Sequence, residues 1–421
     1  MAPNLKIFLG DSFVTTVTGI EQLLTYGQHS IVQIIDLVDN NLGGLDTARL
    51  QATFGALSSC TQLQTIRLDE NNLGLLDGAR LQIIFGALSS CRQLQTIHLN
   101  DNNLDRLDAA RLQAIFGALS SCAQLQTVDL NYNNLDRLDA VRLQIIFGAL
   151  SSTPLQTIDL SGNNLDLLDA ARLQIIFGAL SSCTQLQTID LNHNNLGLLD
   201  AARLQIIFGA LSSCTQLQTI DLNNNNLGSL DAARLQAIFG ALSSCAQLQT
   251  IDLLSNKLGR LDAARLQIIF GALSSTPLQI IYLNNNKLGR LDAARLQIIF
   301  GALSSCTQLQ TIDLTDNHLV SLGTNVLVAL KQCKKLQNII FDENYITDNH
   351  IIEFQRQFND EVINNHRACK TLLMCLEKLR GTQGVALVKD LDLIITGMGG
   401  YTEEGDCSDN VRLRRGRLQI W

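Results

Sequence analysis

The stretch LQTIDLNNNNLG, residues 217–228, places a short alternating segment directly before four consecutive asparagines. In it, Ile220 and Leu222 alternate with Thr219 and Asp221. This alternation is typical of a short strand with one buried face. The stretch therefore predicts a strand that ends in a polar turn.

The next segment, LDAARLQAIFGALSSC at residues 230–245, has a different period. Asp231 precedes a run of good helix formers, which indicates an N-cap. The apolar side chains that share one helical stripe are predicted to be Ala232, Leu235, Phe239 and Leu242. Each unit is therefore a strand, a turn, a helix and a loop.

The same unit fills most of the chain. The phenylalanine of its FGAL segment recurs every 31 residues, or every 30, at Phe54, Phe85, Phe116, Phe147, Phe177, Phe208, Phe239, Phe270 and Phe300. A single unit cannot bury its own apolar face, so the units are expected to stack. Neighbouring strands lie about 4.8 Å apart and neighbouring helices about 8–10 Å apart, so the stack must curve with its strands inside.

The spacing L-x-x-L-x-L-x-x-N-x-L occurs in eleven segments, whose asparagines are Asn40, Asn71, Asn102, Asn133, Asn163, Asn194, Asn225, Asn256, Asn286, Asn317 and Asn344. This spacing resembles the leucine-rich repeat, and the long helical half is similar to the ribonuclease-inhibitor subclass. The resemblance implies an α/β fold: a right-handed, horseshoe-shaped solenoid with a parallel sheet on the concave face and helices on the convex face. It also implies a scaffold that binds other proteins. We expect the asparagines to bond backbone groups of adjacent turns.

The periodicity divides the chain into four parts. Residues 32–346 are predicted to form the solenoid of eleven repeats, mostly of 31 residues. Residues 1–31 and 347–396 are predicted to be an N-terminal cap and a helical C-terminal cap, because the end turns of a solenoid otherwise expose its core. Residues 397–421 are read as a glycine-rich and basic tail.

Composition and charge limit the classes of function. The chain has 421 residues, of which 46% are hydrophobic and 17% charged, enough for a large core. Its net charge of −8 disfavours nucleic acid as a partner and favours a protein with a basic patch. The sequence lacks an apolar run long enough for a membrane span, and its first residues lack the core of a signal peptide. We therefore expect a cytosolic protein. We also expect it to be monomeric.

Seven cysteines occupy the same slot of successive repeats: Cys60, Cys91, Cys122, Cys183, Cys214, Cys245 and Cys306. Thr153 and Thr276 stand near that slot in two shortened repeats, so the slot is not built around a disulfide. We expect buried, reduced thiols. No cofactor and no metal site is predicted, since no cysteines or histidines have the spacing of zinc ligands.

The repeats differ most at positions five and eight of the motif, which are expected to face the concave side. Five successive repeats have aspartate at position five, and other residue types interrupt the two columns. We predict that the partner-binding residues are Arg67, Glu70, His98, Asp129, Tyr132, Asp159, Asp190, His193, Asp221, Asp252, Tyr282 and Asp313. The alternatives are a solvated polar face and a purely structural array without a high-affinity partner.

Catalysis has little support in the repeats. A contact between His98 and Asp129 is expected, but a triad also needs a placed nucleophile and an oxyanion site. The CSD segment at Cys407 resembles the Cys-x-Asp motif of bacterial leucine-rich-repeat ubiquitin ligases, and an enzyme centred on Cys407 is the alternative to a binding protein. The Asp and Arg pairs on the helices, Asp77/Arg80 to Asp292/Arg295, are interpreted as caps with local ion pairs.

The long, nearly uniform array, with few aromatic residues and no recognisable catalytic domain, is similar to leucine-rich-repeat effectors that intracellular bacterial pathogens secrete into host cells. That resemblance implies a binding protein, and not an enzyme, that inhibits or recruits a partner in the host cytosol.

Overall fold

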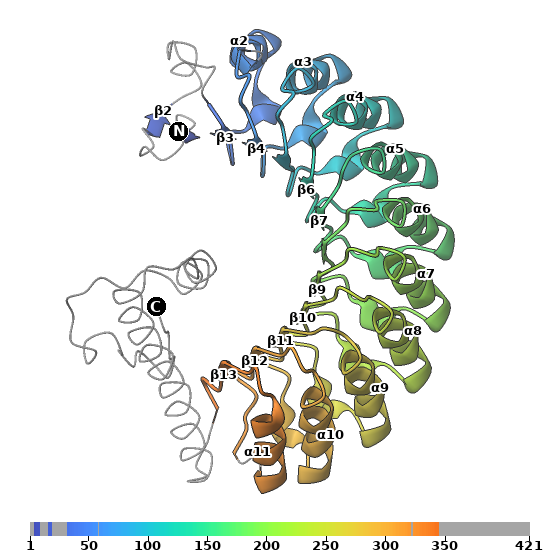
Figure 1. The fold of residues 1–421 in the computed structure, drawn as a ribbon. Helices are drawn as coiled ribbons and strands as arrows, with labels where there is room; N and C mark the ends of the chain where they lie inside the picture. The colour runs from blue at the N-terminus through green and yellow to red at the C-terminus, as the bar shows by residue number, and fades with distance from the viewer. Residues whose placement is uncertain (1–3, 9–15, 19–31, 58, 321–322, 345–421) are drawn as a thin grey trace, which may run out of the picture.

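The computed structural model describes residues 4–8, 16–18, 32–57, 59–320 and 323–344. Within these ranges the chain is a curved stack of strand, turn and helix units. The strands line the inner side of the curve and the helices line its outer side (Figure 1). The predicted horseshoe is confirmed, with a single open sheet.

Eleven strands of the sheet are parallel, and each pairs with the strand of the next repeat. They are β3 Ile34–Asp36, β4 Thr65–Arg67, β5 Thr96–His98, β6 Thr127–Asp129, β7 Thr157–Asp159, β8 Thr188–Asp190, β9 Thr219–Asp221, β10 Thr250–Asp252, β11 Ile280–Tyr282, β12 Thr311–Asp313 and β13 Asn338–Ile340. At the first edge, β1 Asn4–Phe8 runs antiparallel between β3 and β2 Thr16–Thr18.

One helix follows each of ten strands. The helices are α2 Thr47–Leu57, α3 Gly78–Leu88, α4 Ala109–Leu119, α5 Ala140–Leu150, α6 Ala170–Leu180, α7 Ala201–Leu211, α8 Ala232–Leu242, α9 Ala263–Leu273, α10 Ala293–Leu303 and α11 Gly323–Gln332. The predicted cap is present, since the Asp231 side chain accepts from the backbone N–H of Arg234. The predicted stripe needs one correction: Ala232, the first helical residue, is exposed, and Ile238 is buried in its place.

A 3-10 turn joins each strand to its helix in nine repeats. These turns are Leu42–Gly44, Leu73–Leu75, Leu104–Arg106, Leu135–Arg137, Leu165–Leu167, Leu196–Leu198, Leu227–Ser229, Leu258–Arg260 and Leu288–Arg290. The residue before each turn has a positive φ, as Asn226 does at 57°. Asparagine adopts this left-handed conformation more readily than most residues, which explains its frequency there.

The core is one continuous column of apolar side chains between the sheet and the helices. Phenylalanines of successive helices, such as Phe208 and Phe239, are fully buried in it. The cysteines of the common slot are buried and free, as predicted. Burial raises the pKa of these thiols, to about 12 for Cys214 and Cys306. Such thiols are poor nucleophiles at neutral pH.

A ladder of buried asparagines joins the repeats on the strand side, and Asn225 shows its pattern. Its Nδ2 donates to the carbonyl oxygens of Leu191 (2.9 Å) and Asn223 (3.1 Å). Its Oδ1 accepts from the backbone N–H groups of Asn194 (3.2 Å) and Leu196 (3.1 Å). The predicted framework role is confirmed, because one fully buried amide satisfies four backbone groups in two repeats.

Three predicted parts lie largely or wholly outside the described residues. The helical cap at 347–396 and the tail at 397–421, with Cys407, are outside them, and of the cap at 1–31 only the backbone of β1 and β2 is described. These assignments stay predictions.

Candidate functional site

The candidate site begins with the last residue of each strand, which occupies position five of the motif. The strand register places Asp129 beside Asp159, then Asp190, Asp221 and Asp252 on successive strands. We call these five residues the aspartate strip. Adjacent strands are about 4.8 Å apart, so the strip extends over about 19 Å. The strand register thus confirms the predicted alignment of the five aspartates on adjacent strands.

Each aspartate of the strip also closes its own turn. Oδ1 of Asp221 accepts from the backbone N–H of Asn223 (2.7 Å), and Oδ1 of Asp190 accepts from that of Asn192 (2.8 Å). All five are neither fully buried nor fully exposed. One oxygen of each carboxylate thus supports the backbone, which fixes the side chain on the concave face.

Crowding and burial alter the acidity of the strip. Burial, and after it the adjacent Asp159 carboxylate, raise the pKa of Asp190 to about 7. Burial raises the pKa of Asp252 to about 6 and also raises that of Asp221. Part of the strip therefore holds protons near neutral pH, and a cation placed on it would draw those protons off.

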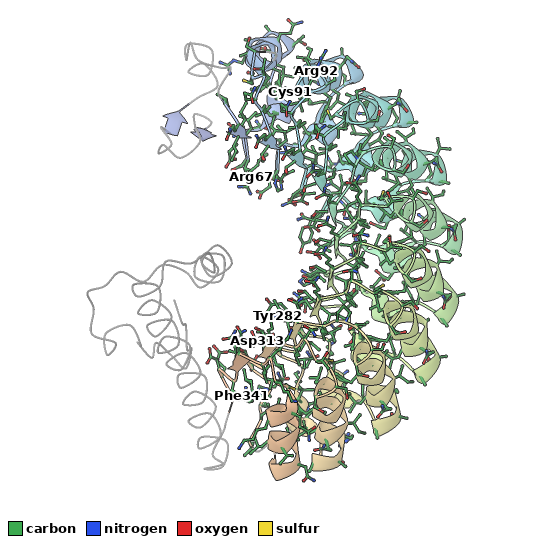
Figure 2. The ribbon with its side chains drawn as sticks, viewed as in Figure 1. Arg67, Cys91, Arg92, Tyr282, Asp313 and Phe341 are labelled. Carbon is green, nitrogen blue, oxygen red and sulfur yellow. The ribbon has the colours of Figure 1, made fainter. Side chains whose placement is uncertain are left out.

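Charges of opposite sign interrupt the column toward the N-terminal end. Arg67 lies 3.7 Å from Asp36 and 3.6 Å from Asp69, and its side chain is 47% exposed. His98 Nδ1 lies 3.4 Å from Asp129 Oδ2, so the predicted contact between them is confirmed. Figure 2 shows Arg67 on the inner side of the curve, near that end.

Position eight of the motif lies in the turn, and its residue has a positive φ in every repeat. Glu70 (58°), Tyr132 (51°) and His193 (55°) share this conformation and are exposed. Gly162 occupies the position in the next repeat after Tyr132, and the Tyr132 ring lies against its α-carbon. A positive φ is uncommon for tyrosine. The turn conformation imposes it at Tyr132, and the side chain is exposed there.

The far end of the column differs in accessibility. Tyr282 stands between Asp252 and Asp313 in the register and is partly exposed. Asp313 is only 7% exposed, and its carboxylate accepts from Thr315 and from Asn284 Nδ2 (2.8 Å). Tyr282 and Asp313 lie on the inner side of the curve in Figure 2. Of the two, Tyr282 is the more accessible to solvent.

Sequence reasoning missed Asp69, which lies in the turn after β4. It is 4% exposed, and burial raises its pKa, while His98 lowers it. One ligand-type atom from each of Asp69, His98 and Asp129 lies within 4.8 Å of the others. The signal in the sequence is that position seven, asparagine in five repeats, is aspartate at residues 69 and 342, and that the repeat after residue 69 has a histidine at position five.

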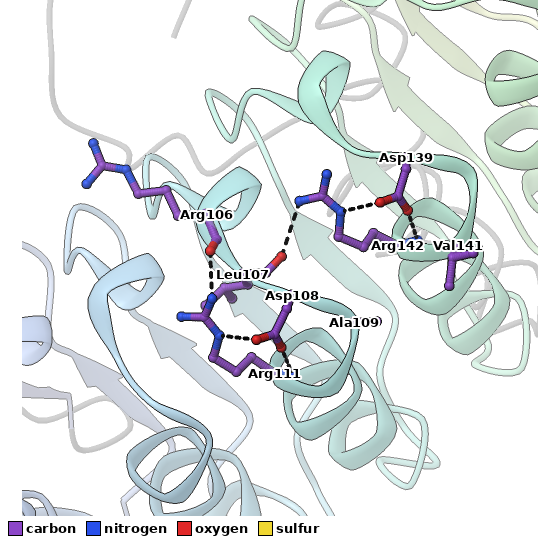
Figure 3. A pocket seen from close by; sticks show the side chains of 8 residues that line it. All are labelled: Arg106, Leu107, Asp108, Ala109, Arg111, Asp139, Val141 and Arg142. Carbon is purple, nitrogen blue, oxygen red and sulfur yellow. Dashed lines mark hydrogen bonds and ion pairs between the residues drawn. The ribbon is translucent and has the colours of Figure 1, made fainter.

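The helix caps on the outer face join neighbouring repeats, which the sequence did not reveal. Arg142 Nε pairs with Asp139 (3.0 Å), as predicted, but Arg142 also donates to the carbonyl oxygen of Leu107 in the preceding repeat (3.3 Å). Figure 3 shows this pair beside the corresponding Asp108 and Arg111, around a shallow hollow. These charges are used in structural bonds, which favours a structural role for the hollow.

Within the described ranges, no helix combines the length and the apolar character needed to cross a membrane.

No protein-family model matches the sequence, and no curated protein matches it. Among solved structures, the chain is similar to the leucine-rich repeat-containing protein LegL7 from Legionella pneumophila. The similarity has a TM-score of 0.54 and 21% sequence identity, and it covers 77% of this chain and 97% of the other. The fold is therefore that of a leucine-rich-repeat solenoid.

Proposed function

We propose that this leucine-rich-repeat solenoid is a binding protein whose concave face takes a basic segment of another protein. The aspartate strip carries the proposal, because it places five acids in one line on the inner face of a curved sheet. Lysine or arginine side chains would replace the protons on its raised-pKa carboxyls. Charge pairs in such a partly buried setting are stronger than pairs on an open surface.

The spacing of the strip selects the shape of the segment. On an α-helix, residues three or four apart are separated by about 4.5–6 Å along the axis, which matches the strand spacing of about 4.8 Å. In an extended strand, side chains on one face repeat every 6.5 Å or so, which does not match. The partner segment is thus an amphipathic helix with a basic face along the strip.

The exposed side chains beside the strip complete the surface. Tyr132 and His193 stand next to it at position eight, and Tyr282 follows its last aspartate. Tyrosine is among the residues that most often anchor interfaces. Arg67 and Glu70, at the N-terminal end, give that end a mixed charge. We assign Asp313 a structural role beside this surface, because its carboxylate already accepts hydrogen bonds from Asn284 and Thr315.

The direct test is to neutralise the strip without disturbing its turns. Asn keeps an Oδ1 acceptor, so we choose the triple variant Asp159→Asn, Asp190→Asn, Asp221→Asn. The matched control removes three charges from the outer face, with Asp169→Asn, Asp200→Asn and Asp231→Asn. The probe is a helical peptide with lysine at every third or fourth position, and a peptide of scrambled order is its comparison.

We expect the strip variant to lose affinity for the helical probe and most of the salt dependence of binding, while the outer variant keeps both. The scrambled peptide should bind more weakly to the unaltered protein. Equal losses in the two triple variants would place the binding site for the basic helix outside the aspartate strip and would contradict the proposal.

We also propose, from the long uniform array and its few aromatic residues, that the protein is a secreted effector of an intracellular bacterium that inhibits or recruits a host protein. Fusion of the full chain to a reporter that is active only in host cytosol tests this. Reporter signal that requires the bacterial secretion system is expected, and its absence would contradict the effector assignment while leaving the basic-helix site untouched.

A further inference from the structure

A compact set of metal-ligand side chains lies at the N-terminal end of the aspartate strip. Asp69 comes from the turn after β4, His98 from the end of β5 and Asp129 from the end of β6. Each offers one ligand atom, and these atoms lie within 4.8 Å of one another. In the part of the chain that the structure describes, this is the one such set of three.

Asp69 has one buried carboxylate oxygen that no hydrogen bond satisfies. Its Oδ1 accepts from the backbone N–H of Asn100 (3.2 Å), but its buried Oδ2 has no hydrogen-bond partner. Arg67 Nε is 3.6 Å from that oxygen, which is an ion pair and not a hydrogen bond. A carboxylate that is 4% exposed and not fully bonded is unfavourable, and a bound cation would remove this penalty.

Other repeats show what is unusual here. In two of them an asparagine at position seven donates Nδ2 to an aspartate of the next strand, as Asn131 does to Asp159 (3.2 Å) and Asn284 to Asp313 (2.8 Å). In the repeat of Asp69 this pattern is changed twice: aspartate replaces the asparagine at position seven, and His98 replaces the aspartate of the next strand. Asparagine oxygens at position seven, such as that of Asn131, also lack a hydrogen-bond partner, but they belong to neutral amides. Only Asp69 places a second carboxylate against an imidazole that already contacts Asp129.

We propose that Asp69, His98 and Asp129 bind a divalent transition-metal ion, for which Zn²⁺ is the natural probe. Zinc takes imidazole nitrogen and carboxylate oxygen at about 2.0–2.2 Å, which puts tetrahedral ligand atoms about 3.4 Å apart. His98 Nδ1 and Asp129 Oδ2 already have this separation, at 3.4 Å. Two carboxylates and a neutral imidazole balance the charge of the ion.

The residues around the three ligands leave room for a fourth ligand and for the movement of Arg67. The side chains of His98 and Asp129 are 27% and 15% exposed, so the fourth coordination position faces the concave side, where water or a partner side chain completes it. Arg67 must move away from the ion. Its side chain is 47% exposed and already pairs with Asp36 (3.7 Å), which can retain it. The site is thus an open, three-ligand site of the kind that accepts an external ligand.

Calorimetric titration of the chelator-treated full chain with Zn²⁺ tests the proposal. His98→Asn removes one ligand, and His193→Asn is the matched control, because His193 is also on the concave face but contacts Asn224. We expect the unaltered protein and His193→Asn to bind Zn²⁺ alike. Loss of a second-shell group weakens metal sites by about 10–100-fold, so loss of His98 should weaken this site by about 100-fold or more.

A second variant and a spectroscopic signal separate ligation from folding. Asp69→Asn installs the residue that the next repeat has at this position, so it should preserve the turn but weaken zinc binding. The chain has six histidines, so the ring-proton NMR signal that disappears in His98→Asn identifies His98. That signal should shift when Zn²⁺ is added. Zinc binding that is unchanged in both variants, or a His98 signal that does not respond, would overturn the proposal.

Discussion

The ring of Tyr132 occupies the space that a side chain at position 162 would need. A Cβ built on Gly162 would approach Tyr132 Cε1 to 2.5 Å. The largest position-eight residue of the array is therefore followed, one repeat later, by the only glycine at that position. Both residues also have a positive φ. The backbone conformation and the packing between the two repeats therefore both fix the position of the Tyr132 ring.

The first prediction concerns this pair. Gly162→Asn introduces a residue that tolerates positive φ, so its main effect is to displace the Tyr132 ring. We expect a lower urea midpoint for Gly162→Asn and recovery when Tyr132→Asn is added, with a coupling energy of at least about 0.5 kcal/mol. Urea unfolding of the two single variants and the double variant measures it. Additive effects would show that the ring and the glycine do not interact.

A second prediction concerns the asparagine ladder. Asn225→Ala leaves the N–H groups of Asn194 and Leu196 without their acceptor inside the solenoid. Each unsatisfied buried group is unfavourable by about 1–3 kcal/mol, so we expect a loss of more than about 3 kcal/mol in the free energy of unfolding. Asn224→Gly, one residue away, is the control, because another repeat already has glycine there. Equal effects of the two changes would contradict the framework role.

A third prediction concerns close contact between neighbouring turns. Gly228 donates its N–H to the carbonyl oxygen of Asn256 (2.8 Å), and a Cβ at Gly228 would overlap the carbonyl oxygen of Lys257. Gly228→Ala should destabilise the protein by about 1–3 kcal/mol, as overpacking does. Asp136 has the corresponding place in another repeat and already carries a Cβ. Asp136→Ala should therefore change the unfolding free energy by less than about 1 kcal/mol, and a Gly228→Ala protein of unchanged stability would refute the contact.

The fourth prediction is a stability that falls as the pH rises from about 4 to about 7. The pKa of Asp190 is raised to about 7 and that of Asp252 to about 6, from 3.8. At a pH between the ordinary pKa and the raised pKa, the folded protein holds protons that the unfolded chain has lost. Raising the pH through this range therefore favours unfolding. Thermal unfolding at a series of pH values should show a higher midpoint at pH 5 than at pH 8.

The matched variants for the pH prediction are Asp190→Asn and Asp200→Asn. Asp190→Asn should flatten the slope between pH 5 and 8 and stabilise the protein at pH 8. Asp200, a helix cap, has a lowered pKa because the backbone N–H of Arg203 bonds to it, so its contribution is lost only as the pH falls below about 4. Asp200→Asn should therefore leave the slope in place. An unchanged slope in Asp190→Asn would assign the effect to other groups.

The sequence was sufficient for the repeat, its curvature and the position of the aspartate strip. Strand and helix periods are local patterns, and a constant interval of 30 or 31 residues fixes which residues stand beside each other on adjacent strands. The roles of Asp231 as a cap and Asn225 as a bridge also follow from local rules, because they satisfy backbone groups that every turn or helix end leaves open.

The tertiary structure alone decided how the differences between repeats combine. It brought the turn residue Asp69 to the strand residue His98, laid Tyr132 over Gly162, and gave Asp190 a pKa well above that of an ordinary carboxyl. These properties depend on distances between side chains of different repeats and on their exclusion from water. A sequence pattern records which residues are neighbours, but not how closely their atoms approach or how much solvent remains between them.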